Sequence, residues 1–533
     1  MPTLTPTTPA DTSTLQTKVD LARREIRLGR TDSAERTLTE VIDDISALSR
    51  LKFWERRTRD LDTIEGAAAS LLGQVRMQQG GMSDGARAAL SRAVELLRLL
   101  IKDEASATAQ AWADYGMALD LLGRSDEATT ALDRALDLGD ASAETSRRLA
   151  GLMLRAGRPA DAEAVLARTL ASGPADAATL RLRGDVLRRL GRVAEAGRSY
   201  FDAGVDAVYG GHLHESLDLF RAAADLLPSE PDTHYAVGEV LRRLDKMEEA
   251  LPAFDRALAL EPAHPAALVS KGDVLRVKGD PKGALAALDA ALAVRSDPLA
   301  LAMKGDLLRA EGDYDGAMLA LDQALALQPD AGWAAGTRGQ VLRALDRLPE
   351  ARDELRRAVG LAPDLAWAWA ELAATEYALA DVEQAVTSAA EALGRDPGNP
   401  LALAVTGLGH LAAGRSGEAV PALEKLTGAV PALDWAWASL AQARSRLGDD
   451  DGALAAADRA LQLSPGHREA FAVRGAVLLR SGPAEQAVEL IQRYVEAWPE
   501  DVQGWQLLAQ ARARAGDHPQ AVRAYDRALQ LRS

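Results

Sequence analysis

Few residues in this chain have the types and spacing that a catalytic or metal-binding site requires. Among the seven histidines, only His212 and His214 stand close together, and Glu215 is the one further ligand beside them. A protein metal site would need a third and a fourth ligand, so we interpret this pair as surface histidines. The chain has no cysteine, which excludes disulfides, thiolate metal sites and thiol nucleophiles.

Sequence motifs for nucleotide binding and for hydrolysis are also missing. Gly-Asp and Gly-Arg pairs recur, but without the GxxxxGK[ST] spacing of a phosphate-binding loop. No serine stands in a GxSxG elbow. Carboxylates are abundant, yet they fall on predicted solvated helix faces in step with a repeat. We therefore expect no catalytic residue, no metal, no cofactor and no enzyme activity.

The charge balance restricts the possible partners. The formal net charge of −16 disfavours phosphate backbones and anionic lipid surfaces, which bind clustered Lys and Arg. No apolar run approaches the roughly 18 residues of a membrane span. Residues 1–14 are rich in Thr and Pro and lack the features of a secretory signal. These features predict a cytoplasmic protein with a disordered start, with no nucleic-acid or membrane partner.

The elements that would position any site are set by an internal repeat. An alanine marks each unit, mostly 34 residues after the last one, with one gap of 33 and one of 54 residues. The marker alanines are Ala128, Ala162, Ala196, Ala250, Ala284, Ala317, Ala351, Ala385, Ala419, Ala453, Ala487 and Ala521.

Each unit reads as two amphipathic helices of about 12–15 residues, because its apolar residues recur at i, i+3, i+4 and i+7. A small residue twelve positions before the marker, such as Gly184, lets the two helix backbones approach closely. A Gly turn such as Gly191-Arg192 ends the first helix, helix A. A proline such as Pro262 follows the second helix, helix B.

This pattern closely resembles the tetratricopeptide family over about residues 109–533. In the first clear unit the motif residues are Trp112, Tyr115, Gly116, Leu119, Ala128, Leu132 and Ala135. The resemblance implies an all-α fold, a right-handed α-solenoid of stacked antiparallel helix pairs. It also implies that the helix-A side, the concave face, binds proteins or peptides.

The register divides the chain into segments. After residues 1–14, residues 15–108 read as degenerate units that cap the array, and 109–197 and 232–533 as regular units. Residues 198–231 break the register as an irregular insertion with an extra helix. The sequence stops directly after a helix B, so we expect either docking of that end, self-association included, or a longer parent protein.

The concave stripe changes character along the chain. With Trp112 as position four, the resemblance puts positions two, five, nine and twelve in the groove. Positions nine and twelve first form an acid–arginine ladder: Asp185/Arg188, Glu239/Arg242, Asp273/Arg276 and Asp306/Arg309, followed by Gln340/Arg343. Later units replace the ladder with apolar or small residues and with Tyr377, and position two carries Trp333, Trp367 and Trp435.

The ladder allows two interpretations. Acids three residues before arginines form modest intrahelical pairs of about 0.2–0.5 kcal/mol, which would stiffen the concave wall. Alternatively, the arginines offer guanidinium groups to a partner's carboxylates or carbonyls. The position-two tryptophans are candidate contacts, because exposed Trp and Arg anchor interfaces. The family's carboxylate clamp needs Asn at position nine, and no unit here has one.

The sequence therefore predicts a scaffold or adaptor that holds a partner protein or peptide in its concave groove. The alternative is a regulatory or sensory subunit that serves an enzyme or effector complex in trans. A third class, the helical-repeat RNA binders, would show a basic groove and a 35-residue period, which this chain lacks. Family resemblance carries function only by analogy.

Overall fold

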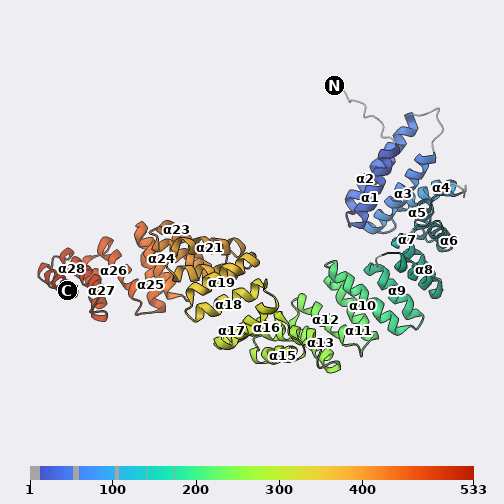
Figure 1. Cartoon of the computed structure of the whole chain (residues 1–533). Coiled ribbons are helices and arrows are strands. Elements are labelled where there is room, and N and C mark those ends of the chain that lie inside the picture. Colours follow the sequence, from blue (N-terminus) through green and yellow to red (C-terminus); the bar gives the residue numbers. More distant parts are fainter. Residues whose placement is uncertain (1–11, 52–58, 103–106, 141, 174–175, 533) are drawn as a thin grey trace, which may run out of the picture. The chain divides into compact units, whose positions relative to one another are not determined.

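The computed structural model describes residues 12–51, 59–102, 107–140, 142–173 and 176–532, and these residues form 29 helices and no strand (Figure 1). The prediction of an all-α solenoid is confirmed. The chain divides into two compact units, residues 1–267 (unit 1) and residues 268–533 (unit 2). In each unit, consecutive helices pack as antiparallel pairs.

Unit 1 contains thirteen whole helices and the start of α14 within its described residues. They are α1 (Thr12–Arg27), α2 (Thr31–Leu51), α3 (Arg59–Gly80), α4 (Asp84–Ile101), α5 (Ala109–Leu121), α6 (Ser125–Asp137), α7 (Ala143–Arg155), α8 (Pro159–Ser172), α9 (Ala177–Arg189), α10 (Val193–Tyr209), α11 (Leu213–Leu226), α12 (Pro231–Arg243) and α13 (Met247–Leu260).

Unit 2 begins within α14 and continues in the same manner. Its helices are α14 (Pro265–Val277), α15 (Pro281–Val294), α16 (Pro298–Glu311), α17 (Tyr314–Leu327), α18 (Gly332–Ala344), α19 (Leu348–Leu361), α20 (Ala366–Ala378), α21 (Val382–Arg395), α22 (Pro400–Ala412), α23 (Ser416–Ala429), α24 (Asp434–Leu447), α25 (Asp450–Leu463), α26 (Arg468–Ser481), α27 (Ala484–Ala497), α28 (Val502–Arg514) and α29 (His518–Gln530).

Two features recur in the regular pairs, although the α26–α27 turn, where Gly482 has φ −90°, lacks the first of them. The residue that turns helix A into helix B has positive φ, as at Gly191 (φ 74°), a conformation that glycine adopts without steric cost. Three units place Asp245, Asp346 or Ala380 at this turn. The small residue at position eight lies under a large side chain of helix B, so that a Cβ added to Gly339 would approach Leu355 Cγ to 2.6 Å.

The register break falls on a helix that belongs to two pairs. Tyr200 of α10 lies over Gly184 of α9, and four residues later Gly204 of the same helix lies under Phe220 of α11. Helix α10 is therefore the B helix of one pair and the A helix of the next. The Ser216 hydroxyl, at the position of the marker alanine, donates to the Gly204 carbonyl at 3.0 Å. Segment 198–231 consists of most of α10, all of α11 and the start of α12.

Arginines at position thirteen join successive A helices late in unit 2. Each reaches back to carbonyls at the C-terminal end of the preceding helix A. Arg446 donates to Leu411 at 3.0 Å, Arg480 to Ser445 at 3.4 Å, and Arg514 to Leu478 at 3.3 Å and to Leu479. These bonds fix the stacking of α22, α24, α26 and α28.

Candidate functional site

The ladder arginines mostly bind the acids of their own helices. In unit 2, Arg276 contacts Asp273 at 2.8 Å and Arg309 contacts Asp306 at 2.8 Å. Both arginine side chains keep about a third of their surface exposed. These pairs are the i, i+3 contacts that the sequence spacing predicts.

In unit 1 the ladder is less regular. Arg242 pairs with Glu239 at 2.7 Å, whereas Arg188 lies 3.7 Å from Asp185, which accepts a hydrogen bond from Tyr200 at 2.6 Å. The Arg188 side chain is accordingly the most exposed of the ladder, at 64 %.

Arg343 makes a different contact from the other ladder arginines. Its partner is Glu371 of the next helix A, at 2.7 Å, and Gln340 donates to the same carboxylate at 2.9 Å. This inter-unit contact marks the point at which the charged part of the stripe ends.

The three position-two tryptophans are partly buried against the preceding helix A. Trp367 lies over Gly336 of α18, where an added Cβ would meet its ring at 2.6 Å. Trp333 packs in a cluster with Ala302, and Trp435 in one with Ala404. Small residues at position five thus form the seats for the indoles of the next unit.

The indole N–H groups of Trp333, Trp367 and Trp435 remain available. Among the described residues none of the three donates a hydrogen bond, and none of these nitrogens is a buried polar atom without a partner. The N–H groups are therefore open to solvent. Beside them, Tyr377 is partly buried against Ala370 and Ala373, and the groove positions of α20 and α22 carry no charged residue.

The tryptophans at position four differ from these, because their indole N–H groups have partners within the chain. The indole N–H groups of Trp369, Trp437 and Trp505 donate to proline carbonyls in the preceding turn, at 2.9, 3.0 and 2.8 Å. Trp369 also stacks under Arg395, with 5.2 Å between the guanidinium carbon and the ring centroid. These tryptophans hold the turns between units.

A polar pocket in unit 1 was missed by the sequence interpretation. Helices α1, α3, α5 and α7 line a cavity of about 260 Å³. Arg23, which lines the cavity, binds the buried Asp114 carboxylate at 2.5 Å across 91 residues of sequence. Gln110 donates to the same carboxylate at 3.1 Å. Position six gave no clear sequence signal, because other units place Arg148 or Glu371 there as well.

Asp114 is expected to titrate near pH 6, because burial raises the pKa of its carboxyl to about 6 while Arg23 opposes the rise. Since the folded-state pKa lies above the unfolded value, this group's contribution to stability is lost as the pH rises through 6. Carboxyl-carbon NMR of Asp114 should give a midpoint near 6, and Asp114→Asn should remove that resonance. A midpoint below about 3.9, the ordinary value for Asp, would show that Arg23 outweighs burial.

Within the described ranges, no group of three or more His, Asp or Glu side chains is arranged to hold a metal ion. No helix in those ranges combines the length and the apolar character that crossing a bilayer requires.

Paired antiparallel helices, repeated with a close A–B crossing and a left-handed turn, define an α-helical repeat protein of the class that forms protein-interaction scaffolds. A tetratricopeptide repeat model matches residues 148–207, 201–265, 241–300, 302–366, 370–434, 405–468 and 472–533, and a second matches 109–138. The chain belongs to the tetratricopeptide repeat family. Two matches overlap at 201–207, within the shared helix α10. Members of this family are typically non-enzymatic.

Solved structures with the same kind of repeat are similar to parts or most of the chain. The Cut9–Hcn1 hetero-tetramer of the APC/C matches at 15 % identity and TM-score 0.37, over 88 % of this chain and 98 % of that one. YrrB, a TPR protein with an unusual peptide-binding site, matches at 23 % and 0.29, over 34 % and 95 %. PilW, a type IV pilus biogenesis factor, matches at 18 % and 0.36, over 39 % and 97 %. No curated protein matches the chain.

Proposed function

We propose that this protein is a scaffold that holds a segment of a partner protein against the helix-A face of unit 2, between Trp333 and Trp435. The observation that carries the proposal is the set of three half-buried indoles with open N–H groups. Each ring is fixed in a seat of small residues, so little side-chain entropy would be lost on binding. Fixed, partly exposed tryptophans are typical anchors of protein interfaces.

The spacing of the tryptophans suits an extended segment. Packed helices lie about 8–10 Å apart, and three residues of an extended chain span about 10 Å. Trp333 and Trp367, one unit apart, would therefore contact residues three apart in the partner. Their N–H groups would donate to backbone carbonyls, while the uncharged floor around Tyr377 would accept apolar side chains.

The ladder would contribute to orientation more than to affinity. Arg276 and Arg309 already bind Asp273 and Asp306, so a partner carboxylate would have to share them. Exposed charges of this kind mainly influence association rates and the choice of partner. The alternative, a regulatory subunit that serves an enzyme complex in trans, uses the same surface and differs in what the partner does.

The test begins with crosslinking and affinity capture from native lysate, followed by affinity measurement with the purified partner. Trp333, Trp367 and Trp435 changed together to Ala should weaken binding by at least about 30-fold, since a single interface hot spot is already worth about 2 kcal/mol. The Trp→Phe triple variant keeps the apolar contact but removes the indole N–H donors, so its loss of affinity measures the contribution of their hydrogen bonds. Unchanged affinity in the Ala variant would refute the proposed site.

A second variant tests the ladder with the same partner. Changing Arg242, Arg276 and Arg309 to Glu should reduce the association rate more than it increases the dissociation rate. A control with Leu99, Leu361 and Leu447 changed to Ala removes exposed apolar residues from other surfaces and should bind normally.

A further inference from the structure

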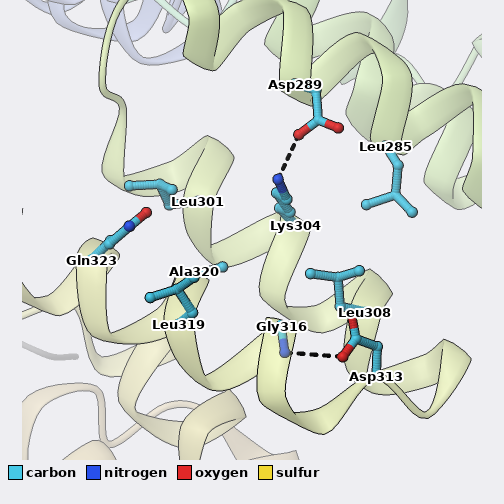
Figure 2. Close-up of a pocket in the computed structure, with 10 residues that line it drawn as sticks. All are labelled: Leu285, Asp289, Leu301, Lys304, Leu308, Asp313, Gly316, Leu319, Ala320 and Gln323. Carbon is cyan, nitrogen blue, oxygen red and sulfur yellow. Dashed lines mark hydrogen bonds and ion pairs between the residues drawn. The ribbon is translucent and has the colours of Figure 1, made fainter.

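The helix-B side of unit 2 contains a groove that is separate from the proposed partner site. It lies between α15 and α17 over the outer face of α16, and the Lys304–Asp289 ion pair, at 2.6 Å, divides it into halves of about 320 and 470 Å³. Figure 2 shows the first half, with Lys304 directed at Asp289. The connection between α15 and α16 has three residues here, whereas the other B–A connections of unit 2 have four.

This groove is lined by leucines whose spacing suits contact with a helix. On each of its three helices two leucines stand seven or eight residues apart, which places them on one helical face. They are Leu285 and Leu292 on α15, Leu301 and Leu308 on α16, and Leu319 and Leu327 on α17. Leu319 is 63 % exposed, so the groove presents apolar surface to solvent.

Helix α29 exposes an apolar stripe that matches such a groove. Val522, Tyr525 and Leu529 stand at i, i+3 and i+7, and Leu529 is 63 % exposed. The equivalent residues one unit earlier, Ile491 and Val495 on α27, are 2 % and 1 % exposed because α28 covers them. This face of a B helix is one that normally packs against another helix.

The charges of the two surfaces are complementary. The groove is lined by two carboxylates, Asp289 and Asp313, and one amine, Lys304. Helix α29 carries two arginines and one aspartate, and Arg532 follows Leu529 at the end of the stripe. In a chain of net charge −16, α29 is a locally basic segment. Unlike charges of this kind orient association and fix its register.

We propose that α29 of one copy docks in the α15–α17 groove of a second copy. Val522, Tyr525 and Leu529 cover the groove leucines, and Arg532 pairs with a groove carboxylate. The contact uses different surfaces on the two copies, so two copies can form it reciprocally in a twofold dimer, or it can continue into a larger ring or an open chain. One helix of three to four turns buries a small area, so we expect an affinity on the order of micromolar. The inference is independent of the proposed partner site.

The test is sedimentation equilibrium at tens of micromolar with Leu319→Glu and Leu529→Glu, two substitutions at exposed positions, and circular dichroism to verify folding. Wild type should exceed the monomer mass of 56.5 kDa, and each variant alone should remain monomeric. An equal mixture of the two should form a dimer, because one intact groove and one intact α29 remain. Leu99→Glu, at an equally exposed leucine of α4, should assemble like wild type.

Three results would overturn the proposal. A monomeric wild type would exclude self-association at this strength. Assembly of Leu319→Glu but not of Leu529→Glu would mean that α29 pairs with another surface, such as α29 itself. A mixture of the two variants that stays monomeric would exclude the head-to-tail contact.

Discussion

Gly204→Ala is expected to destabilise the middle of unit 1 by about 1–3 kcal/mol, the usual cost of overpacking. The new Cβ would lie 2.7 Å from the Phe220 ring, closer than real Cβ contacts allow. Helix propensity alone predicts the opposite sign, since Ala in a helix interior is favoured over Gly by about 0.5–1 kcal/mol. A loss of stability in Gly204→Ala, rather than a gain, would therefore be direct evidence for the close crossing of α10 and α11.

Helix α10 cannot relieve this clash by shifting. Tyr200, four residues earlier on the same face, packs over Gly184 of α9 with the same closeness, so a shift of α10 would disturb the contact with α9 as well. The measurement is hydrogen exchange of α10 and α11 amides, because repeat arrays unfold locally as well as globally. Gly151→Ala on α7 is the control: its Cβ would meet only the end of Arg155, at 3.6 Å, and should stabilise. Equal protection of wild type and Gly204→Ala would contradict the shared-helix packing.

Arg23→Met is expected to release α1 from the array, with a loss of roughly 3–5 kcal/mol for breaking a buried ion pair. Asp114 is 1 % exposed, so its carboxylate would remain in the interior without its counterion. The pKa of Asp114 should then rise further above 6. The variant should be less stable at pH 7.5 than at pH 5, where protonation removes the buried charge.

Limited proteolysis at the α1–α2 turn and hydrogen exchange of α1 would measure this effect. The double variant Arg23→Met/Asp114→Asn should recover much of the loss, because no buried charge remains. Arg24→Met, at the exposed neighbouring residue, should be near neutral. If Arg23→Met alone proved neutral, the bridge between α1 and α5 would contribute nothing to the packing of this end of unit 1.

The sequence by itself determined the repeat, because its evidence is local. Helix periodicity, left-handed glycine turns and the i, i+3 pairs such as Asp306–Arg309 each depend on residues within one helix or turn. The contacts that the sequence did not predict join separate helices.

Tertiary structure decided how the units join, because those contacts depend on stacking geometry rather than on spacing along the chain. Arg23 reaches Asp114 across 91 residues, and Arg343 turns from its own helix to Glu371 of the next. The insertion resolved into one helix that serves two pairs, since Tyr200 and Gly204 share a face of α10. A 34-residue repeat specifies each helix pair. The sizes and charges of side chains on the contacting faces determine how each pair packs against its neighbours.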